Sequence, residues 1–272
     1  MQPEIDVLGL PLKTFGLMFA LGFLAAGAIV TRRLRELGKP VDWASEIVFA
    51  SLAGGLIGAR LYWAVQNWDQ VSGDPIGGLF GGTGLTWYGG AIGGAVFVLA
   101  WARWRGWWDL TVLDVSCLPL AMGYAIGRIG CQLSGDGDYG KAWDGPWAMA
   151  YPHGTVPTTE TVHPTPIYET TAMVLGTWLL WRVRDRFRPG VLFALYLVLA
   201  GGERFLVEFL RRNDRVVAGL TAPQLESLVL LLAGVVWLLV VARRGGLRRP
   251  EPPPAGRDGA RRRRPAAASA SR

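Results

Sequence analysis

The sequence predicts an all-α fold, a polytopic membrane helix bundle with seven transmembrane helices. Three observations lead to this prediction: the chain is 51% apolar and only 18% charged, against roughly 25% charged in a soluble domain; long apolar runs recur along it; and its basic residues gather in alternate connections. This composition excludes a soluble enzyme and a disordered chain. It also excludes a nucleic-acid binder despite the net charge of +7, because the positive excess is not spread through a globular body.

A helix needs about 20 predominantly apolar residues to cross a bilayer, and seven stretches of the chain fit this requirement. They span residues 14–31, 44–65, 85–102, 110–127, 166–181, 191–210 and 225–242. The first stretch is not a cleavable signal sequence, because Glu4 and Asp6 precede it and Arg32 and Arg33 follow it, the reverse of the usual order. We therefore expect it to remain as a helix with its N-terminus outside.

Lysine and arginine are distributed unevenly between the two sides that these helices define. One side carries 20 of them and the other only 5, and cytoplasmic loops carry the excess in membrane proteins. The count predicts an N-terminus outside and a cytoplasmic C-terminus. Residues 1–244 then form one transmembrane domain with an outer loop at about 134–164. Residues 245–272, rich in arginine and proline, are expected to form a disordered basic cytoplasmic tail.

The chain offers few residues for a metal or redox centre. Its cysteines, Cys117 and Cys131, fit neither a disulfide framework nor a CxxC motif, and two histidines are too few for a zinc cluster. Asp136 and Asp138 hint at a cation site, but the DGD sequence lacks the further acidic ligands of a calcium loop. We therefore expect no metal and no cofactor.

Charged residues within the predicted helices are the strongest functional signal, because a charge at the bilayer centre costs at least a few kcal/mol. Those inside the stretches or at their ends are Arg60, Asp114, Arg128, Glu169, Glu203, Arg204 and Glu208. One interpretation is that they pair with one another, as Arg204 and Glu208 can across one helical turn. The other is a binding site, because arginines on three segments suit bidentate binding of phosphate. The second interpretation predicts an anionic lipid headgroup as ligand.

Glycines gather beside these charges. The pairs with the small-xxx-small spacing of closely packed membrane helices are Gly54/Gly58, Gly90/Gly94 and Gly123/Gly127. The stretch GRIGCQLSGDGDYG, residues 127–140, contains five glycines and two aspartates. We expect the chain to leave the helix there and to turn at the outer face, where backbone amides and Arg128 meet a ligand.

Six motifs occur in an order that resembles a known family. From the first to the sixth helix they are GLMFALGF, GGLIGARLYW, TWYGGAIGG, GRIGCQLSGDGDYG, HPTPIYE and ERFLVEFLRRND. The order is similar to that of the bacterial prolipoprotein diacylglyceryl transferases over residues 12–240, with GRIG and RFLVEF the most specific elements. The resemblance implies an inner-membrane enzyme that moves a diacylglyceryl group from phosphatidylglycerol to the lipobox cysteine of a preprolipoprotein. A thioether forms and glycerol phosphate is released.

The resemblance also implies the partners of the protein. They are phosphatidylglycerol, preprolipoprotein signal peptides with a lipobox cysteine, and membrane lipids, with no nucleic acid. Seven helices and a periplasmic N-terminus agree with this family. The alternatives are a diverged paralogue with altered chemistry and a carrier of anionic lipid that binds headgroups without transfer. A carrier would be expected to show internal repeats, so the ordered motifs favour the transferase.

The resemblance assigns roles to particular residues. Carried over by motif, the two essential arginines of the family fall on Arg128 and Arg204, the glutamate of its RFxVEF element on Glu208, and the glycine that closes the signature on Gly140. Arg60, in the second helix, joins the two arginines as a candidate ligand of the phosphate. Because the substrate peptide supplies the nucleophile, the enzyme needs no catalytic serine or cysteine of its own.

Three positions depart from the family pattern, and they concern proton transfer and recognition of the acceptor. Tyr88 stands where the family has histidine, Cys131 where it has asparagine, and Phe15 where it has tyrosine. The general base stays open between Tyr88, Glu208 and an acid of the DGD turn. We expect Tyr88 to act by positioning or hydrogen bonding, Cys131 to be a small residue at a tight turn of the substrate site, and His163 to be a loop or capping residue.

Overall fold

The computed structural model describes residues 2–7, 10–73 and 86–250, and most of these are helical. The long helices are α1 (Thr14–Glu36), α2 (Trp43–Gln66), α5 (Trp87–Trp104), α6 (Thr111–Ser134), α7 (Thr165–Val183), α8 (Val191–Val207) and α9 (Ala222–Arg243). A short helix α3 (Trp68–Gly73) follows α2, and a 3-10 turn η1 (Glu208–Leu210) follows α8. Each predicted apolar stretch thus matches one long helix, although residue 85 lies outside the described residues.

Four of the described helices, α1, α2, α6 and α9, are long and apolar enough to cross a membrane. With 22 to 24 residues each, they reach about 33–36 Å at 1.5 Å per residue, which exceeds the ~30 Å hydrocarbon core. Large apolar side chains such as Leu24, Phe49 and Val65 are exposed. Lipid tails are as apolar as these side chains, so their exposure fits a membrane protein.

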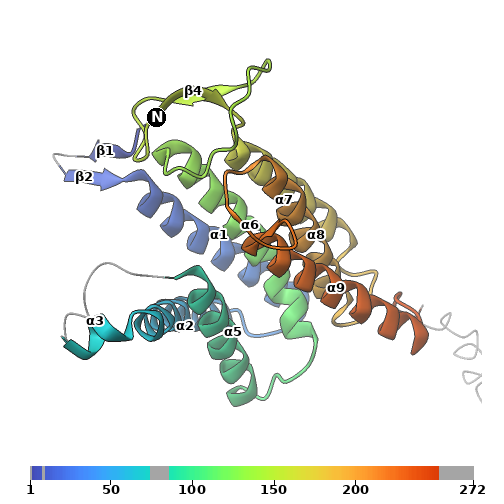
Figure 1. The fold of residues 1–272 in the computed structure, drawn as a ribbon. Coiled ribbons are helices and arrows are strands. Elements are labelled where there is room, and N and C mark those ends of the chain that lie inside the picture. The colour runs from blue at the N-terminus through green and yellow to red at the C-terminus, as the bar shows by residue number, and fades with distance from the viewer. Residues whose placement is uncertain (1, 8–9, 74–85, 251–272) are drawn as a thin grey trace, which may run out of the picture.

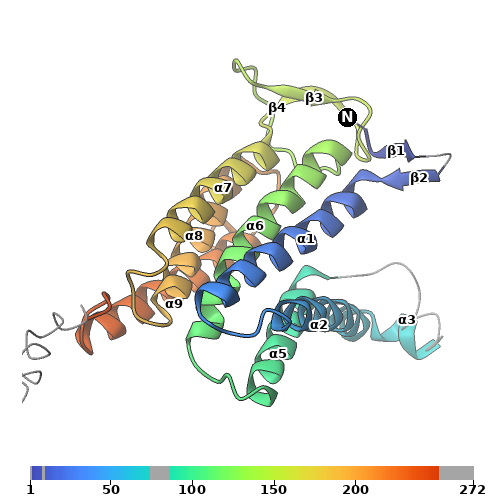
Figure 2. The ribbon, with the colours of Figure 1, turned by 180° about the vertical axis from the view of Figure 1, so that it is seen from behind.

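Short strands pair into two-stranded antiparallel sheets in three connections of the described chain. They are β1 (Glu4–Val7) with β2 (Leu10–Lys13), β3 (Met149–Tyr151) with β4 (Thr158–Val162), and β5 (Arg215–Val217) with β6 (Leu220–Thr221). Figures 1 and 2 show the first two hairpins at one end of the bundle, here called the hairpin end. The all-α prediction holds for the bundle but misses these connections, because such short strands carry no distinctive hydropathy period.

Helix α6 runs through the middle of the bundle. It packs against α1 on one side and α7 on the other, and α8 and α9 follow α7 in order. In both ribbon views α2 and α5 lie together on one side of α1 and α6, with α7, α8 and α9 on the other (Figures 1 and 2). At the end opposite the hairpins, Trp101 and Trp107 pack with Val30 and Leu34 in one core. This core joins the α2–α5 pair to α1 and α6.

Helices α2 and α5 touch through glycines. A Cβ atom added to Gly58 would lie only 2.8 Å from the Cα atom of Gly93, so the two backbones are in contact. The predicted packing role of Gly58 is therefore confirmed. On α5 the closest approach is made by Gly89 and Gly93, and the predicted pair Gly90 and Gly94 faces α2 less tightly.

The third predicted glycine pair divides into two different environments. A Cβ atom added to Gly22 of α1 would lie 3.8 Å from the Cα atom of Gly123, so the Gly123 backbone faces α1. A Cβ atom added to Gly123 itself would meet no atom within 4 Å, and close packing does not require glycine there. A Cβ atom added to Gly127 would meet no atom within 4 Å. Helix packing therefore does not explain Gly127.

Helix α6 extends beyond its predicted end. The sequence predicts a turn from residue 127, but the helix continues to Ser134, because a glycine costs a helix only about 1 kcal/mol and the residues around Gly127 and Gly130 compensate for it. The helix stops at Gly135, whose φ of 59° is the left-handed conformation of many helix C-termini. Arg128 therefore projects from a helix and not from a loop.

The residues that follow α9 lie against the connection between α7 and α8. The backbone N–H of Arg188 donates to the carbonyl of Leu247, and that of Arg249 donates to the carbonyl of Arg186, each at 3.0 Å. The first residues of the predicted tail, up to residue 250, are therefore placed against the α7–α8 connection. The rest of the predicted tail, residues 251–272, lies outside the described residues.

Candidate functional site

Glu169 is the centre of a buried charged cluster at the hairpin end of the bundle. It lies one turn into α7, and its side chain has no exposed surface. One carboxylate oxygen accepts hydrogen bonds from Tyr124 Oη at 2.9 Å and from Arg204 Nη1 at 3.0 Å. The other oxygen lies 3.2 Å from Arg128 Nε. Because an unpaired buried charge is costly, these partners are what allow a carboxylate at this position.

Glu208 is a second centre, where α8 tightens into the 3-10 turn η1. One of its oxygens lies 3.1 Å from Arg204 Nη2. The other accepts hydrogen bonds from Asn213 Nδ2 at 2.6 Å and from Thr221 Oγ1 at 2.9 Å. The pairing of Arg204 with Glu208 that their one-turn spacing predicts is confirmed.

Asp138 brings the loop after α6 into the cluster. Its carboxylate accepts hydrogen bonds from Arg128 and Arg211, one on each oxygen. Arg211 also lies 3.6 Å from Glu169 through Nη1 and 3.7 Å from Glu208 through Nε. Arg211 therefore contacts all three carboxylates, and the cluster balances three arginines against three acids.

The two aspartates of the loop ionise differently. Burial alone would raise the pKa of Asp138, but Arg128 and Arg211 outweigh burial and hold that pKa below its usual value. Burial dominates at Asp136 and raises its pKa. Asp138 is therefore the firmly charged member of the DGD turn.

Gly140 connects this loop to the ends of α7 and α8. Its N–H donates to the carbonyl of His163 at 2.8 Å, and the next N–H, of Lys141, donates to the carbonyl of Leu210 at 2.7 Å. A Cβ atom at residue 140 would lie 2.6 Å from the Leu210 oxygen and 2.9 Å from the Cβ atom of His163. Only glycine fits between these neighbours, so Gly140 is required for the loop to close over the cluster.

The structure brings together four of the residues that the sequence singles out: Arg128, Arg204, Glu208 and Gly140. Both interpretations of the buried charges contain part of the answer, because the arginines pair with acids and yet remain partly accessible. The side chains of Arg128 and Arg204 are 14% and 21% exposed. Their guanidinium groups converge on Glu169 from two helices, an arrangement that can hold an anionic group.

Cys131 lies beside this cluster on α6. It is a buried free thiol, and its Sγ is 3.9 Å from Arg128 Nη1. Ligand atoms of Cys131, Asp136 and Asp138 lie within 4.8 Å of one another, which is the cation geometry that the DGD turn hints at. Arg128 and Arg211 already occupy Asp138, and their positive charge opposes a metal ion there. These residues therefore fit an arginine-bridged site better than a cation site.

The structure places the other two sequence-predicted site residues in different surroundings. Tyr88, at the start of α5, donates a hydrogen bond to the carboxylate of Glu226 on α9. Arg60 lies on α2 with its guanidinium carbon 4.4 Å from the centre of the Trp63 ring. Tyr88 therefore acts as a hydrogen-bond donor here, and Arg60 belongs to the α2–α5 pair.

Two further residues of the sequence argument lie at the hairpin end. Phe15 on α1 approaches the signature segment, since a Cβ atom added to Gly130 would lie 3.4 Å from its ring. His163 stacks on Trp143 with ring centres 4.4 Å apart, and burial lowers its pKa. With its carbonyl bound to the N–H of Gly140, His163 is a loop residue, as predicted.

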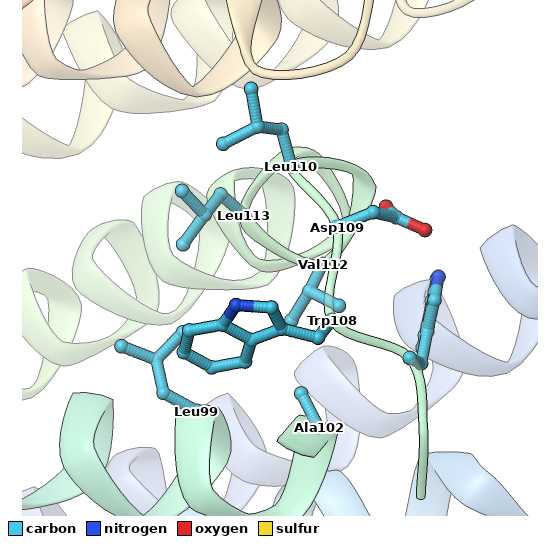
Figure 3. Close-up of a pocket in the computed structure, with 8 residues that line it drawn as sticks. Leu99, Ala102, Trp108, Asp109, Leu110, Val112 and Leu113 are labelled. Atoms are coloured by element: carbon cyan, nitrogen blue, oxygen red, sulfur yellow. The ribbon is translucent and has the colours of Figure 1, made fainter.

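A separate cavity of about 230 Å³ lies near the end opposite the hairpins, between α5 and the start of α6. In Figure 3 the side chains of Leu99 and Ala102 lie on one side of Trp108, and those of Leu110 and Leu113 on the other. Its walls are mostly apolar, with Asp109 as the charged exception. The lining residue nearest to Arg128 along α6, Leu113, precedes it by 15 residues, or about 22 Å of helix, so the cavity is not part of the charged cluster.

Sequence reasoning missed three contributors to the site: the roles of Tyr124 and Glu226, and the position of Arg211. Arg211 follows the apolar stretch 191–210 and counts among the five basic residues of the outer side, yet it follows Arg204 by seven residues, two helical turns that return to the same face. That spacing was the available signal. Glu226 carried no such signal, because its contact with Tyr88 depends on how α9 packs.

A bundle of apolar helices, of which four in the described chain are long enough to cross a membrane, is the architecture of a membrane protein. Comparison with known families gives this class a specific identity. The chain belongs to the prolipoprotein diacylglyceryl transferase family, whose sequence model matches residues 4–240.

Curated relatives span nearly the same length. A protein of Clostridium tetani is 31% identical over 239 residues, covering 86% of this chain and 96% of the relative. One of Chromohalobacter salexigens is 33% identical over 257 residues, covering 86% and 93%. One of Dehalococcoides mccartyi is 31% identical over 237 residues, covering 83% and 88%. All three are named phosphatidylglycerol--prolipoprotein diacylglyceryl transferase.

Proposed function

We propose that this chain transfers the diacylglyceryl group of phosphatidylglycerol to the lipobox cysteine of preprolipoproteins, the first step of lipoprotein maturation. One observation carries the proposal: Arg128 and Arg204 share Glu169 from two helices while each keeps part of its guanidinium side chain exposed. Two converging guanidinium groups suit the phosphodiester of the lipid, because their planar donors match phosphate oxygens. Membership of the transferase family supports the same conclusion.

The transfer requires a thiolate, a carbon that bears a leaving group, and neutralisation of the departing phosphate. The thiolate sulfur attacks the glyceryl carbon that carries the phosphate, the carbon–oxygen bond breaks, and glycerol phosphate leaves with the bonding electrons. Arg128 and Arg204 stabilise the developing negative charge, more strongly in a dry site than in water. Glu169 orients both arginines, and Glu208 orients Arg204, before the lipid binds.

The proposal includes a topology in the bacterial inner membrane. Residues 1–244 form a catalytic domain with seven spans, in which α5, α7 and α8, about 26–29 Å long at 1.5 Å per residue, approach the ~30 Å core thickness. The hairpin end, the N-terminus and the loop at about 134–164 face the periplasm, and residues 245–272 face the cytoplasm. Reporter fusions after Arg186 and Arg244 should report cytoplasm, and a fusion near Gly154 the periplasm. A periplasmic signal at Arg244 would remove this topology.

Mass spectrometry of a lipobox peptide incubated with the purified protein and phosphatidylglycerol tests the activity. The expected product carries a diacylglyceryl thioether. Arg128→Lys and Arg204→Lys keep the charge but lose the planar fork, so each should lower the rate by about 10²-fold or more. Arg215→Lys, on the exposed strand β5, is the matched control and should match wild type.

Two results would contradict the proposal in different ways. Wild-type rates in both Arg128→Lys and Arg204→Lys would remove these arginines from the reaction. A wild-type protein that binds phosphatidylglycerol but yields no thioether would point to the diverged paralogue or the lipid carrier.

A further inference from the structure

Glu203 is a carboxyl group of the site that the charged cluster does not use. It precedes Arg204 on α8 and follows Leu199 by one turn, and Leu199 packs with Ala121 and Met173 of α6 and α7. The one-turn spacing therefore directs Glu203 toward the same two helices. Its carboxyl lies close enough to the cluster to interact electrostatically with Tyr124 and Arg128 of α6, Glu169 of α7, Arg204 of α8 and Arg211 after η1.

Glu203 differs from the other acids of the site because its oxygens are unoccupied. Asp138, Glu169 and Glu208 are each held by two or three arginines. Among the described residues, Glu203 makes no hydrogen bond and no ion pair. The residue is only half-buried, and neither of its oxygens belongs to the fully buried polar atoms that lack a hydrogen-bond partner. A substrate can therefore reach this carboxyl, whereas Glu169 and Glu208 are enclosed.

The transfer needs a proton acceptor of this kind. A free cysteine has a pKa of about 8.5, so only about 3% of it is thiolate at pH 7. Tyr88, the residue in the histidine position of the family, uses its hydroxyl as a donor to Glu226, and a neutral phenol is a poor acceptor. Glu208 is enclosed: one of its oxygens accepts hydrogen bonds from Asn213 and Thr221, and the other is buried 3.1 Å from Arg204 Nη2. Within the described chain, Glu203 thus combines two features, oxygens that make no hydrogen bond and access from outside the cluster, whereas Glu169 and Glu208 are enclosed.

We propose that Glu203 is the general base of this enzyme, an inference that rests on the proposed transferase activity. Its carboxylate takes the proton of the lipobox thiol as the sulfur forms its bond to the glyceryl carbon. The bond between that carbon and the phosphate oxygen breaks, and its electron pair leaves with glycerol phosphate beside Arg128 and Arg204. The protonated Glu203 then releases its proton to water, which restores the starting state.

Glu203→Gln tests the proposal, because glutamine keeps the shape of the side chain and cannot accept the proton. General base catalysis contributes about 10²- to 10⁴-fold, so the variant should lose at least 10²-fold in transfer rate at pH 6.5 while still binding phosphatidylglycerol vesicles. Its remaining rate should rise about 50-fold between pH 6.5 and 8.5, in step with the ionised fraction of the thiol. Glu160→Gln, an exposed acid paired with Arg212, is the matched control and should behave as wild type.

A peptide with selenocysteine at the lipobox position separates a base from a structural residue. A selenol is more acidic than a thiol and is ionised without help, so it should react with wild type and with Glu203→Gln at similar rates. A wild-type rate of Glu203→Gln on the cysteine peptide would overturn the proposal. A loss that neither higher pH nor selenocysteine restores would overturn it as well. Absence of any transfer by the wild-type protein would instead refute the underlying activity.

Discussion

Replacing Glu169 with glutamine removes the charge on which Arg128 and Arg204 converge. Both carboxylate oxygens face donors: one meets Tyr124 and Arg204, and the other meets Arg128 and Arg211. Glutamine has only one oxygen, so its amide NH₂ must point at a guanidinium group whichever way it turns. The substitution therefore leaves at least one buried arginine facing another donor.

The size of this effect follows from burial. The side chain of Glu169 is 0% exposed and those of its arginine partners are 8% to 21% exposed. Breaking such a buried pair by removing one charge costs about 3–5 kcal/mol. The surface pair of Glu160 with Arg212, 66% and 40% exposed at 3.2 Å, should contribute below about 1 kcal/mol.

Denaturant unfolding of wild type, Glu169→Gln and Glu160→Gln in the same detergent micelles measures the difference in the free energy of unfolding. We expect the Glu169 variant to fall below the Glu160 variant by at least about 2 kcal/mol, the gap between the two estimates. If the two variants unfold with equal free energies, the cluster does not depend on Glu169. The assignment of Glu169 as its centre would then be incorrect.

Three further predictions follow from single contacts. Gly140→Ala should destabilise the protein by about 1–3 kcal/mol, because its Cβ atom would lie 2.6 Å from a backbone oxygen. In the control variant Gly202→Ala the added Cβ atom meets no atom within 4 Å, so its stability should not fall. Thermal unfolding in detergent compares the two variants. Tyr88→Phe removes the hydrogen bond to Glu226 and should slow transfer, while Tyr88→His should be tolerated; an unchanged rate for Tyr88→Phe would exclude the hydroxyl. Burial raises the pKa of Asp138, but two arginines outweigh it and lower that pKa. The charge of Asp138 therefore stabilises the fold at any pH above about 3.9, the pKa of an aspartate in the unfolded chain. This contribution is lost as pH falls through the lowered pKa of the folded protein. Asp138→Asn should therefore weaken the acid dependence of the free energy of unfolding below about pH 4, and an unchanged dependence would contradict the pairing.

The positions of the long helices follow from the sequence because each is a long apolar run, a signal that lipid solvation makes strong. The end of α6 does not. Gly127 and Gly130 carry the composition of a turn, but the helix passes through both and stops at Gly135. The position of Gly135 depends on its close approach to Gly154 of the outer loop, a contact between distant parts of the chain that local composition does not record.

The residues of the candidate site likewise fall into those that the sequence identifies and those that it does not. Arg128, Arg204 and Glu208 are identifiable because charges inside apolar helices are rare. Arg211 lies beyond the apolar run and reads as a solvated loop residue, but the fold turns it back into the cluster, where its side chain is only 8% exposed. Sequence therefore reveals charges that the membrane makes costly, and it hides those that only tertiary contacts bury.

The glycine contact between α2 and α5 has a mechanical consequence. Because backbone rests on backbone with no side-chain layer between them, sliding or rotating one helix past the other would bring backbone atoms together, and we expect the pair to move as one unit. The aromatic core around Trp101 and Trp107 anchors this helix pair at one end, and the hydrogen bond between Tyr88 and Glu226 connects the other end to α9. We therefore expect loss of this hydrogen bond to loosen the contact between the start of α5 and α9.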